Sequence, residues 1–169
     1  AGSHEVYSDQ FGYDIVGGKY TIRKKQLTLA LKSGATFDKT YDGTQDVKQK
    51  LTKDANYTLT GFIGTEGDAI TLDETTTGTY SDQNAGDKTV TFAGLTLTGT
   101  GNDNYALPQT TLTTTGTIAK KQLNLALKSG ATFDKTYDGT QTVKQQLTKG
   151  SNYTLEGFIG NEGADIQLA

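Results

Sequence analysis

Apolar and polar residues alternate along long stretches of this chain, so that every second side chain is apolar. The alternation is clearest in TVTF at 89–92 and in LTLT at 95–98. Because successive side chains of a strand point to opposite faces, the pattern predicts strands that bury one face. Between the two stretches the pattern shifts by one residue at Ala93-Gly94, which predicts a β-bulge. Within one sequence period the predicted strands are 26–32, 35–41, 46–51, 57–63, 69–72, 78–80, 88–98, 104–107 and 110–118.

The spacing of these strands predicts the fold class. Turn residues separate strands that recur about every 8–12 residues, which is typical of a β-sandwich. We therefore expect an all-β fold made of immunoglobulin-like β-sandwich modules. One segment leaves an alternative open, because Val47 and Leu51 are four residues apart, as on one face of a helix. A short helix near 45–53 would make each module a small α+β unit of the β-grasp kind.

The nine-residue segment FDKTYDGTQ occurs twice, at 37–45 and at 133–141, 96 residues apart. Aligned without a gap, residues 24–72 and 120–168 are identical at 39 of 49 positions. The apolar positions of this stretch other than Ala55 and Ala69 are the same in both copies. A small protein rarely needs one catalytic motif twice, whereas a repeated structural unit reuses one core. The sequence therefore predicts tandem modules of about 96 residues.

The repeat also predicts where the chain is divided. Each period has a head, 24–72 in the first copy, and a tail, 73–118. Apolar positions change from even to odd numbers at the Lys-Lys pairs at 24–25 and 120–121, which favours a junction there. The expected segments are 1–23 (vector-derived residues and the abbreviated tail of a preceding repeat), 24–119 (a complete repeat) and 120–169 (the head of the next), or, in the alternative phase, 1–72 and 73–169.

Composition excludes several classes of function. The 16 basic and 19 acidic residues are spread along the chain and give a net charge of −3, so the basic patch of a nucleic-acid-binding protein is missing. No apolar run approaches the roughly 20 residues of a membrane-spanning helix, so we expect no membrane insertion. The chain has no Cys, and its single His, His4, lies in AGSH at 1–4, which resembles residues left by cloning. Without His-dependent triads or zinc sites, we expect no enzyme, no cofactor and no metal site.

The most specific motif is the Tyr-Asp-Gly sequence inside each copy of the repeat. Asp-Gly is a turn pair, since Asp hydrogen-bonds the nearby backbone and Gly accepts a positive φ. A neighbouring Tyr can bury its ring and keep its hydroxyl in water. We interpret the motif as a structural turn with an aromatic anchor, and a ligand-contacting loop is the alternative. Its residues are Tyr41, Asp42, Gly43, Tyr137, Asp138 and Gly139.

Two other chemistries have weaker support. The segment GNDN at 101–104 is rich in oxygen ligands, as a Ca²⁺ site would be. It lacks a spaced set of carboxylates with a bidentate Glu, so a polar hairpin turn is the favoured interpretation. An intramolecular Lys–Asn isopeptide link would suit a stalk without Cys. It needs a buried Lys, an Asn or Asp and a catalytic carboxylate close together, and the sequence alone does not place these three groups.

Four segments together resemble a YDG domain: KTYDGT at 39–44, GTYSDQNAG at 78–86, VTFAGLTLTG at 90–99 and NDNYAL at 102–107. Such domains repeat in tandem in very large bacterial surface proteins similar to filamentous haemagglutinins. The resemblance covers one whole period and half of a second. It implies a secreted adhesin at the bacterial cell surface, with these repeats in its long shaft. The family offers no catalytic residues to carry over.

The expected function is therefore that of a stalk, in which non-catalytic modules project a distal binding domain away from the cell. The alternative is an adhesive module that itself binds a host glycan or protein. The expected partners are neighbouring repeats of the same polypeptide and, in the alternative, a host-cell receptor. The incomplete head at 120–169 also predicts weak self-association, with residues 7–22 of another molecule covering its exposed strands.

Overall fold

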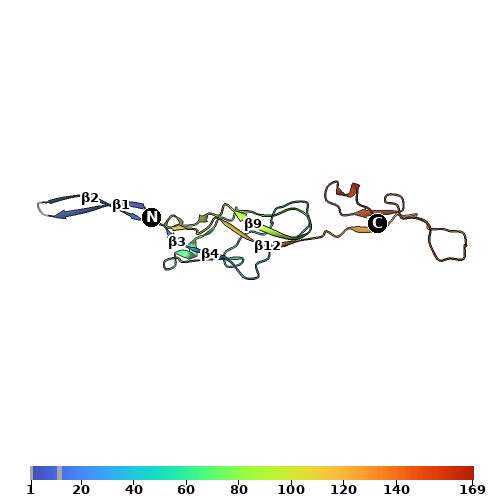
Figure 1. Cartoon of the computed structure of the whole chain (residues 1–169), viewed down its shortest axis with the longest axis horizontal. Helices are drawn as coiled ribbons and strands as arrows, with labels where there is room; N and C mark the ends of the chain where they lie inside the picture. Colours follow the sequence, from blue (N-terminus) through green and yellow to red (C-terminus); the bar gives the residue numbers. More distant parts are fainter. Residues whose placement is uncertain (1, 11–12) are drawn as a thin grey trace.

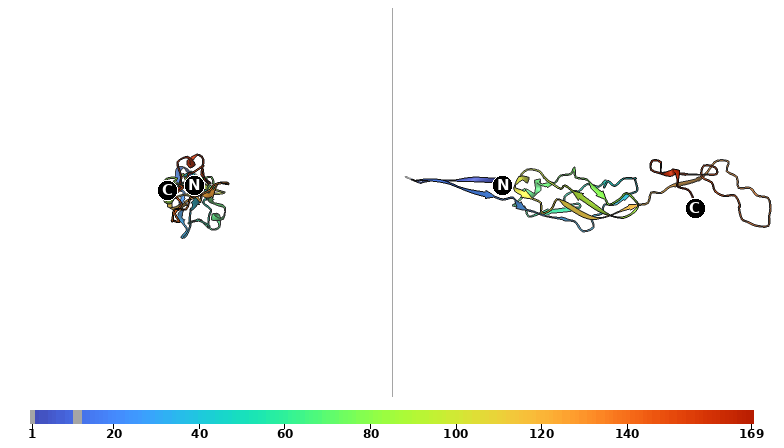
Figure 2. Two further views of the ribbon diagram at one scale, coloured as in Figure 1. Left: turned by 90° about the vertical axis from the view of Figure 1, so that its right-hand side faces the viewer. Right: turned by 45° about the horizontal axis from the view of Figure 1, so that its top comes forward.

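The computed structural model describes residues 2–10 and 13–169 of the chain. The molecule is long and narrow, with three parts in a row: an N-terminal hairpin, a central part (24–119) and a C-terminal part (120–169) (Figure 1). Viewed along its long axis it has a small cross-section, and a second side view shows the same end-to-end order (Figure 2).

The hairpin consists of β1 (Gly2–Gln10) and β2 (Tyr13–Ile22), which pair antiparallel with a register shift between Val6 and Ser8. Its first residues lie next to its last ones, because Gly2 pairs with Ile22. The N-terminus therefore lies where the hairpin meets the central part (Figure 1). Ala1 lies outside the described residues. The origin predicted for residues 1–23 stays a prediction.

The largest sheet of the central part has four strands in the order β5-β12-β9-β8. Strands β9 and β12 pair antiparallel from Thr111 with Ala93 to Ile118 with Gly86, and β5 runs parallel to the end of β12. On β12 the side chains of Leu112 and Ile118 are buried while most of the Thr residues between them face outward. This period-two arrangement is what the alternating sequence predicts. The strands are β5 (Lys39–Thr40), β8 (Gly78–Tyr80), β9 (Gly86–Ala93) and β12 (Thr111–Ala119).

Three two-stranded pairs complete the central part. Two of them, β4-β6 and β7-β10, are antiparallel, and β3-β11 is parallel. Their strands are β3 (Lys25–Gln26), β4 (Thr28–Leu31), β6 (Tyr57–Thr60), β7 (Thr71–Leu72), β10 (Leu97–Thr98) and β11 (Tyr105–Ala106). Two short 3₁₀ turns lie between strands, η1 (Glu66–Ala69) and η2 (Asn102–Asn104). The regular structure of the described part of the chain is mostly strand, and this part contains no α-helix.

The helix considered near 45–53 is wrong, and so is the predicted strand 46–51. This segment makes only an isolated bridge between Asp46 and Thr79, strengthened by a hydrogen bond from the Val47 amide to the Gly78 carbonyl (2.9 Å). Val47 and Leu51 are both buried because an irregular segment turns inward twice. Their four-residue spacing therefore does not come from a helical turn, and the β-grasp alternative loses its helix.

Most other predicted strands are present, with shorter boundaries. The predicted strand 78–80 coincides with β8, whereas 35–41 is reduced to β5. The predicted strand 88–98 is divided into β9 and β10. Gly94, which follows β9 directly, has φ +71, so the chain turns where the alternation changes face. The bulge expected at Ala93-Gly94 is thus an interruption between two strands that pair with different partners.

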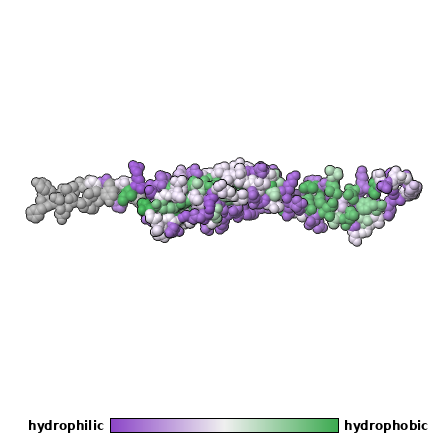
Figure 3. Space-filling model, turned by 90° about the horizontal axis from the view of Figure 1, so that it is seen from below, coloured by the Kyte–Doolittle hydropathy of each residue, from purple (hydrophilic) through white to green (hydrophobic). Residues whose placement is uncertain are grey.

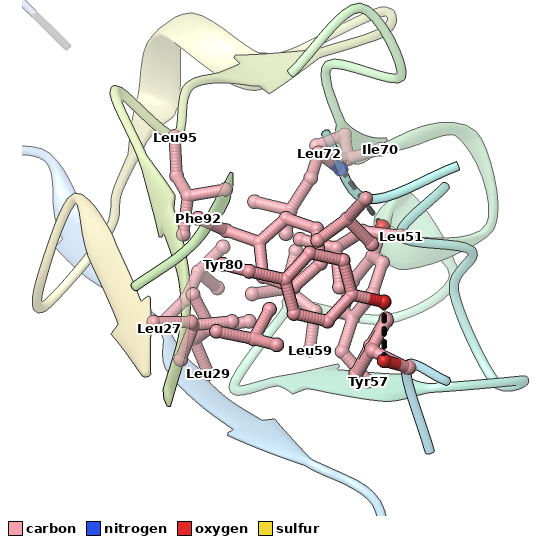
Figure 4. Close-up of a cluster of buried hydrophobic side chains, with 14 of the residues drawn as sticks. Leu27, Leu29, Leu51, Tyr57, Leu59, Ile70, Leu72, Tyr80, Phe92 and Leu95 are labelled. Atoms are coloured by element: carbon pink, nitrogen blue, oxygen red, sulfur yellow. Dashed lines mark hydrogen bonds between the residues drawn. The ribbon is translucent and has the colours of Figure 1, made fainter. Parts of the chain in front are cut away.

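One hydrophobic core fills the central part (Figure 4). Its aromatic residues also satisfy buried backbone groups: the Tyr80 hydroxyl donates to the Phe37 carbonyl (2.6 Å), and the Leu72 amide donates to the Tyr57 hydroxyl (2.9 Å). The rings of Phe37 and Phe92 meet edge to face with centroids 4.9 Å apart. The buried members are Leu27, Leu29, Phe37, Val47, Leu51, Tyr57, Leu59, Ile70, Leu72, Tyr80, Val90, Phe92, Leu95, Tyr105, Leu112 and Ile118.

The C-terminal part repeats the local structure of the first head, but its apolar side chains are less buried. Strand β13 (Asn124–Leu127) pairs antiparallel with β14 (Tyr153–Glu156), as β4 does with β6, and η3 (Glu162–Ala164) corresponds to η1. Leu51 is 2 % exposed, but its counterpart Leu147 is 48 % exposed. Hydrophobic side chains gather on the surface of this part (Figure 3). The division into 1–23, 24–119 and 120–169 stays a prediction, as does the alternative phase.

Candidate functional site

The first Tyr-Asp-Gly turn is organised around Lys39, the first residue of β5. The Lys39 ammonium donates to Asp42 Oδ1 (2.6 Å), to the Thr44 carbonyl (2.8 Å) and to the Thr44 hydroxyl (3.0 Å). It also reaches the Asp46 carbonyl (3.2 Å) and lies 5.1 Å from the ring centroid of Tyr80. Although it is charged, the Lys39 side chain is only 7 % exposed. A buried ammonium needs several acceptors, and the turn supplies them.

Asp42 and Gly43 form the bend itself. Asp42 Oδ1 accepts hydrogen bonds from the Thr44 amide (3.0 Å) and the Thr44 hydroxyl (2.8 Å), as in an Asx turn. Gly43 has φ +75, which a residue with a side chain adopts only with strain. The hydrogen bond from Lys39 holds the pKa of the Asp42 carboxyl well below its usual range, and those from Thr44 add to this.

The second copy forms the same turn in different surroundings. Lys135 donates to Asp138 Oδ1 (2.8 Å), to the Thr140 carbonyl (2.6 Å) and to the Thr140 hydroxyl (3.0 Å). Gly139 has φ +75, as Gly43 has. No strand of the described chain includes residues of this second turn. The bend is therefore encoded by its own residues and does not depend on the four-stranded sheet.

Tyr41 and Tyr137 show how the two copies differ. The Tyr41 amide donates to the Ala119 carbonyl (2.8 Å), and its hydroxyl donates to Glu162 Oε1 of the C-terminal part. This bond to Glu162 is the main cause that raises the pKa of the Tyr41 hydroxyl. Tyr137, by contrast, is 91 % exposed. The first Tyr is thus an anchor between two parts of the molecule, and the second extends into solvent.

A hollow of ≈ 410 Å³ lies where the central and C-terminal parts meet. On its central side are Tyr41 and the segment 84–85, and a methyl group placed on Gly43 would be 3.1 Å from Ile159 Cγ2. The other side is formed by Lys120, Lys121, Leu123, Gly157, Phe158, Ile159, Glu162 and Ile166. The hollow therefore lies beside the first Tyr-Asp-Gly turn, between the two copies of the repeated sequence.

A second Tyr–Glu contact lies inside the central part. The Tyr105 hydroxyl donates to Glu66 Oε2 and accepts a hydrogen bond from the Ile63 amide (3.1 Å). The Tyr105 ring meets Phe62 edge to face, with centroids 5.1 Å apart. Glu66 corresponds to Glu162 in the other copy. Both copies of this Glu therefore accept a hydrogen bond from a Tyr, one within its own part and one across the junction.

The sequence pattern indicated the Tyr, Asp and Gly of the motif but not Lys39 and Glu162. Lys39 and Thr44 recur unchanged at 135 and 140, and this recurrence is the signal that could have identified the centre of the turn. The oxygen-rich segment 101–104 contains η2, and the side-chain Nδ2 of Asn102 donates to the Leu97 carbonyl (2.9 Å). Within residues 2–10 and 13–169 no three His, Cys, Asp or Glu side chains are grouped so as to hold a metal ion.

The fold and the turns together define a class of protein module. Its regular structure is mostly short strands, without α-helices in its described residues, and a lysine stabilises each of its repeated turns. The family model described as YDG domain matches residues 23–114, more than half of the chain. The chain belongs to the YDG domain family. Comparison with curated proteins finds no match, and neither does comparison with solved structures. Among the residues that the structure describes, no helix is long and apolar enough to cross a membrane.

Proposed function

We propose that this chain is a non-catalytic, extracellular repeat module that forms part of the stalk of a bacterial surface adhesin and projects a distal binding domain. One observation carries the proposal: the central and C-terminal parts, which share a repeated sequence, lie end to end and meet through Tyr41 and Glu162. In a linear array each module contacts only its neighbours, so stability adds up along the chain. A stalk needs this kind of repeated contact.

The proposal extends to the architecture of a complete module. We propose an immunoglobulin-like β-sandwich, in which the sheet β5-β12-β9-β8 packs across the core on the pairs β4-β6 and β7-β10. Its support is that the core draws buried residues from both groups of strands, for example Phe92 of β9 and Leu59 of β6. The edge-to-face contact of Phe37 with Phe92 lies within this core.

The experiment is to measure length against the number of modules by small-angle X-ray scattering. A chain extended by one further copy of residues 24–119 is compared with the present chain. Strands of roughly ten residues at about 3.3 Å each predict that the maximum dimension grows by about 30–40 Å per added module. A chain whose modules cluster side by side would grow in cross-section at nearly constant length, and that result would exclude a stalk.

The alternative function, binding of a host glycan or protein by the module itself, stays a prediction. The feature that would support it is Tyr137, an aromatic ring that is 91 % exposed on a rigid turn. A glycan array or a host-protein pull-down with the chain and with Tyr137→Ala would test it. Binding that the substitution removes, while the chain stays folded, would favour the adhesive module over the passive stalk.

A further inference from the structure

The loop at 41–43 and the loop at 137–139 have the same sequence and the same hydrogen-bonded geometry. The first loop is docked: Tyr41 donates to Glu162, and Gly43 lies against Ile159. The second is not docked, since Tyr137 is 91 % exposed. The chain therefore carries two copies of the same loop, of which one is docked and the other is not.

The surface that receives the docked loop also exists twice. It is the segment FIGNEG at 158–163, and the first copy is FIGTEG at 62–67. Both copies have the same local structure, since a methyl group placed on Gly67 or on Gly163 would be 2.5 Å from the ring of the preceding Phe in each case. The copy at 62–67 has Ile63, which is 62 % exposed. The first copy of the receiving segment thus keeps Ile63 open to a partner, while its Phe62 and Glu66 contact Tyr105 of the same part.

We propose that the Tyr137-Asp138-Gly139 loop of one molecule docks onto the segment 62–67 of a second copy of this chain, reproducing between molecules the junction that Tyr41 makes within one. The inference rests on the proposed function, because it takes the Tyr41 junction as the contact between neighbouring modules. The resulting contact is heterologous, so it joins molecules head to tail in chains and does not close into a symmetric dimer.

The chemistry of the receiving segment allows this contact. Glu66 already accepts a hydrogen bond from Tyr105, but a carboxylate has two oxygens and about four acceptor positions, so it can also accept from Tyr137. Ile63 offers Gly139 the apolar contact that Ile159 offers Gly43. The docking loop is already ordered by Lys135 and Asp138, so little conformational entropy is lost on binding.

The contact is small, and association between separate molecules is therefore weak. A covalent array does not need a stronger contact, because a short link gives neighbouring modules an effective concentration of about millimolar. The hairpin β1-β2 leaves the central part at the end where β3 lies, near the pair β3-β11 that contains Tyr105 (Figure 1). The incoming loop must bind beside this hairpin, which weakens the contact further.

The test is a dilution series of the whole chain up to about 1 mM, which matches the effective concentration that a short covalent link provides. Each sample is followed by amide NMR and sedimentation equilibrium. The expected result is a concentration-dependent shift confined to 62–67 and 137–140, with an average mass that rises on concentration. Tyr137→Ser and Ile63→Asp each weaken association at least tenfold. Both side chains are exposed, so neither substitution affects folding. Leu127→Ser, which changes an exposed residue of the uncovered β13, leaves association unchanged.

Mixing the two variants gives the sharpest readout. Tyr137→Ser keeps a receiving segment and Ile63→Asp keeps a docking loop, so each alone is monomeric while the mixture forms a heterodimer and nothing larger. A wild-type chain that stays monomeric at about 1 mM overturns the inference. So does association that Leu127→Ser removes and Tyr137→Ser does not, because the uncovered strands would then be the contact. Neither of these two results contradicts the proposed stalk, because the stalk is tested by the length of a single chain.

Discussion

The Nζ atom of Lys39 lies 2.6 Å from Oδ1 of Asp42, in a turn where the lysine side chain is almost completely buried. A charged pair out of water is stable only when the remaining donors and acceptors are also satisfied. Here the ammonium reaches backbone carbonyls of the same loop, and the carboxylate accepts from Thr44. One ion pair thus holds the loop that carries Tyr41 to the junction.

Replacing Lys39 with Met is expected to destabilise the central part by about 2–3 kcal/mol, because it leaves Asp42 and the loop carbonyls without their charged donor. Urea unfolding followed through the amide signals of β9 and β12 measures the change. The matched control is Lys135→Met, which removes the same group from an exposed turn and is expected to cost no more than about 1 kcal/mol. Equal losses for the two variants would show that burial of the Lys39 pair contributes nothing.

Stability is expected to fall in acid partly because of Asp42. Its pKa in the folded chain is lowered, chiefly by Lys39, so the folded state binds this proton more weakly than the unfolded state does. The contribution is therefore complete above the pKa of an unfolded Asp, about 3.9, and is lost progressively as the pH falls below it. The measurement is the difference in urea midpoint between the wild type and Asp42→Asn, which is expected to shrink from pH 6 to pH 2.5. A constant difference would contradict the assignment.

The alternation of the sequence predicted the sheet better than it predicted the loops. β8 and β12 were predictable because exposed Thr residues alternate there with inward-facing positions, most of which are Gly, Tyr, Leu or Ile. The segment 45–53 was not, since two buried residues four apart fit a helix as well as an irregular loop that turns inward twice. Nothing in the sequence distinguishes Lys39 from the other lysines, and only the folded turn shows that its side chain is buried.

The sequence could not predict the junction between the central and C-terminal parts, for a different reason. Tyr41 and Glu162 are 121 residues apart, and nothing in either local sequence indicates the other. The repeat predicted that two modules follow one another but not which loop of one faces which segment of the next. The docked state of the first loop is a property of the end-to-end arrangement, whereas the turn itself is local.

The two copies of the repeat allow a test of burial within one chain. Leu51→Ala is expected to destabilise the central part by about 2–5 kcal/mol, because it leaves a cavity in a closed core. Leu147→Ala changes the same residue in the same local sequence, but its side chain is 48 % exposed, so the expected loss is below about 1 kcal/mol. Chemical unfolding of the two variants measures both values. Similar losses would mean that the C-terminal part is closed in solution, which would favour the alternative division at 72–73.

A further prediction concerns the hydroxyl of Tyr41. Tyr41→Phe keeps the ring and removes only the donor to Glu162, so the central part is expected to keep its stability. What changes is the junction: the central and C-terminal parts lose their fixed relative orientation, which residual dipolar couplings report as different alignment of β9 and β13. Tyr137→Phe is the matched control, because that hydroxyl lies on an exposed ring.

The same hydroxyl makes the junction sensitive to alkali. The hydrogen bond to Glu162 raises the pKa of Tyr41, so the neutral, donating form persists above the ordinary tyrosine pKa of about 10. The bond is complete below that value and is lost as the pH rises through the raised pKa, when two negative charges face each other. Absorbance titration of the wild type and Glu162→Gln is expected to show one tyrosine ionising at lower pH in the variant. If the two titrations coincide, Glu162 does not hold Tyr41 in solution, and the contact that joins the two parts must lie elsewhere in the hollow.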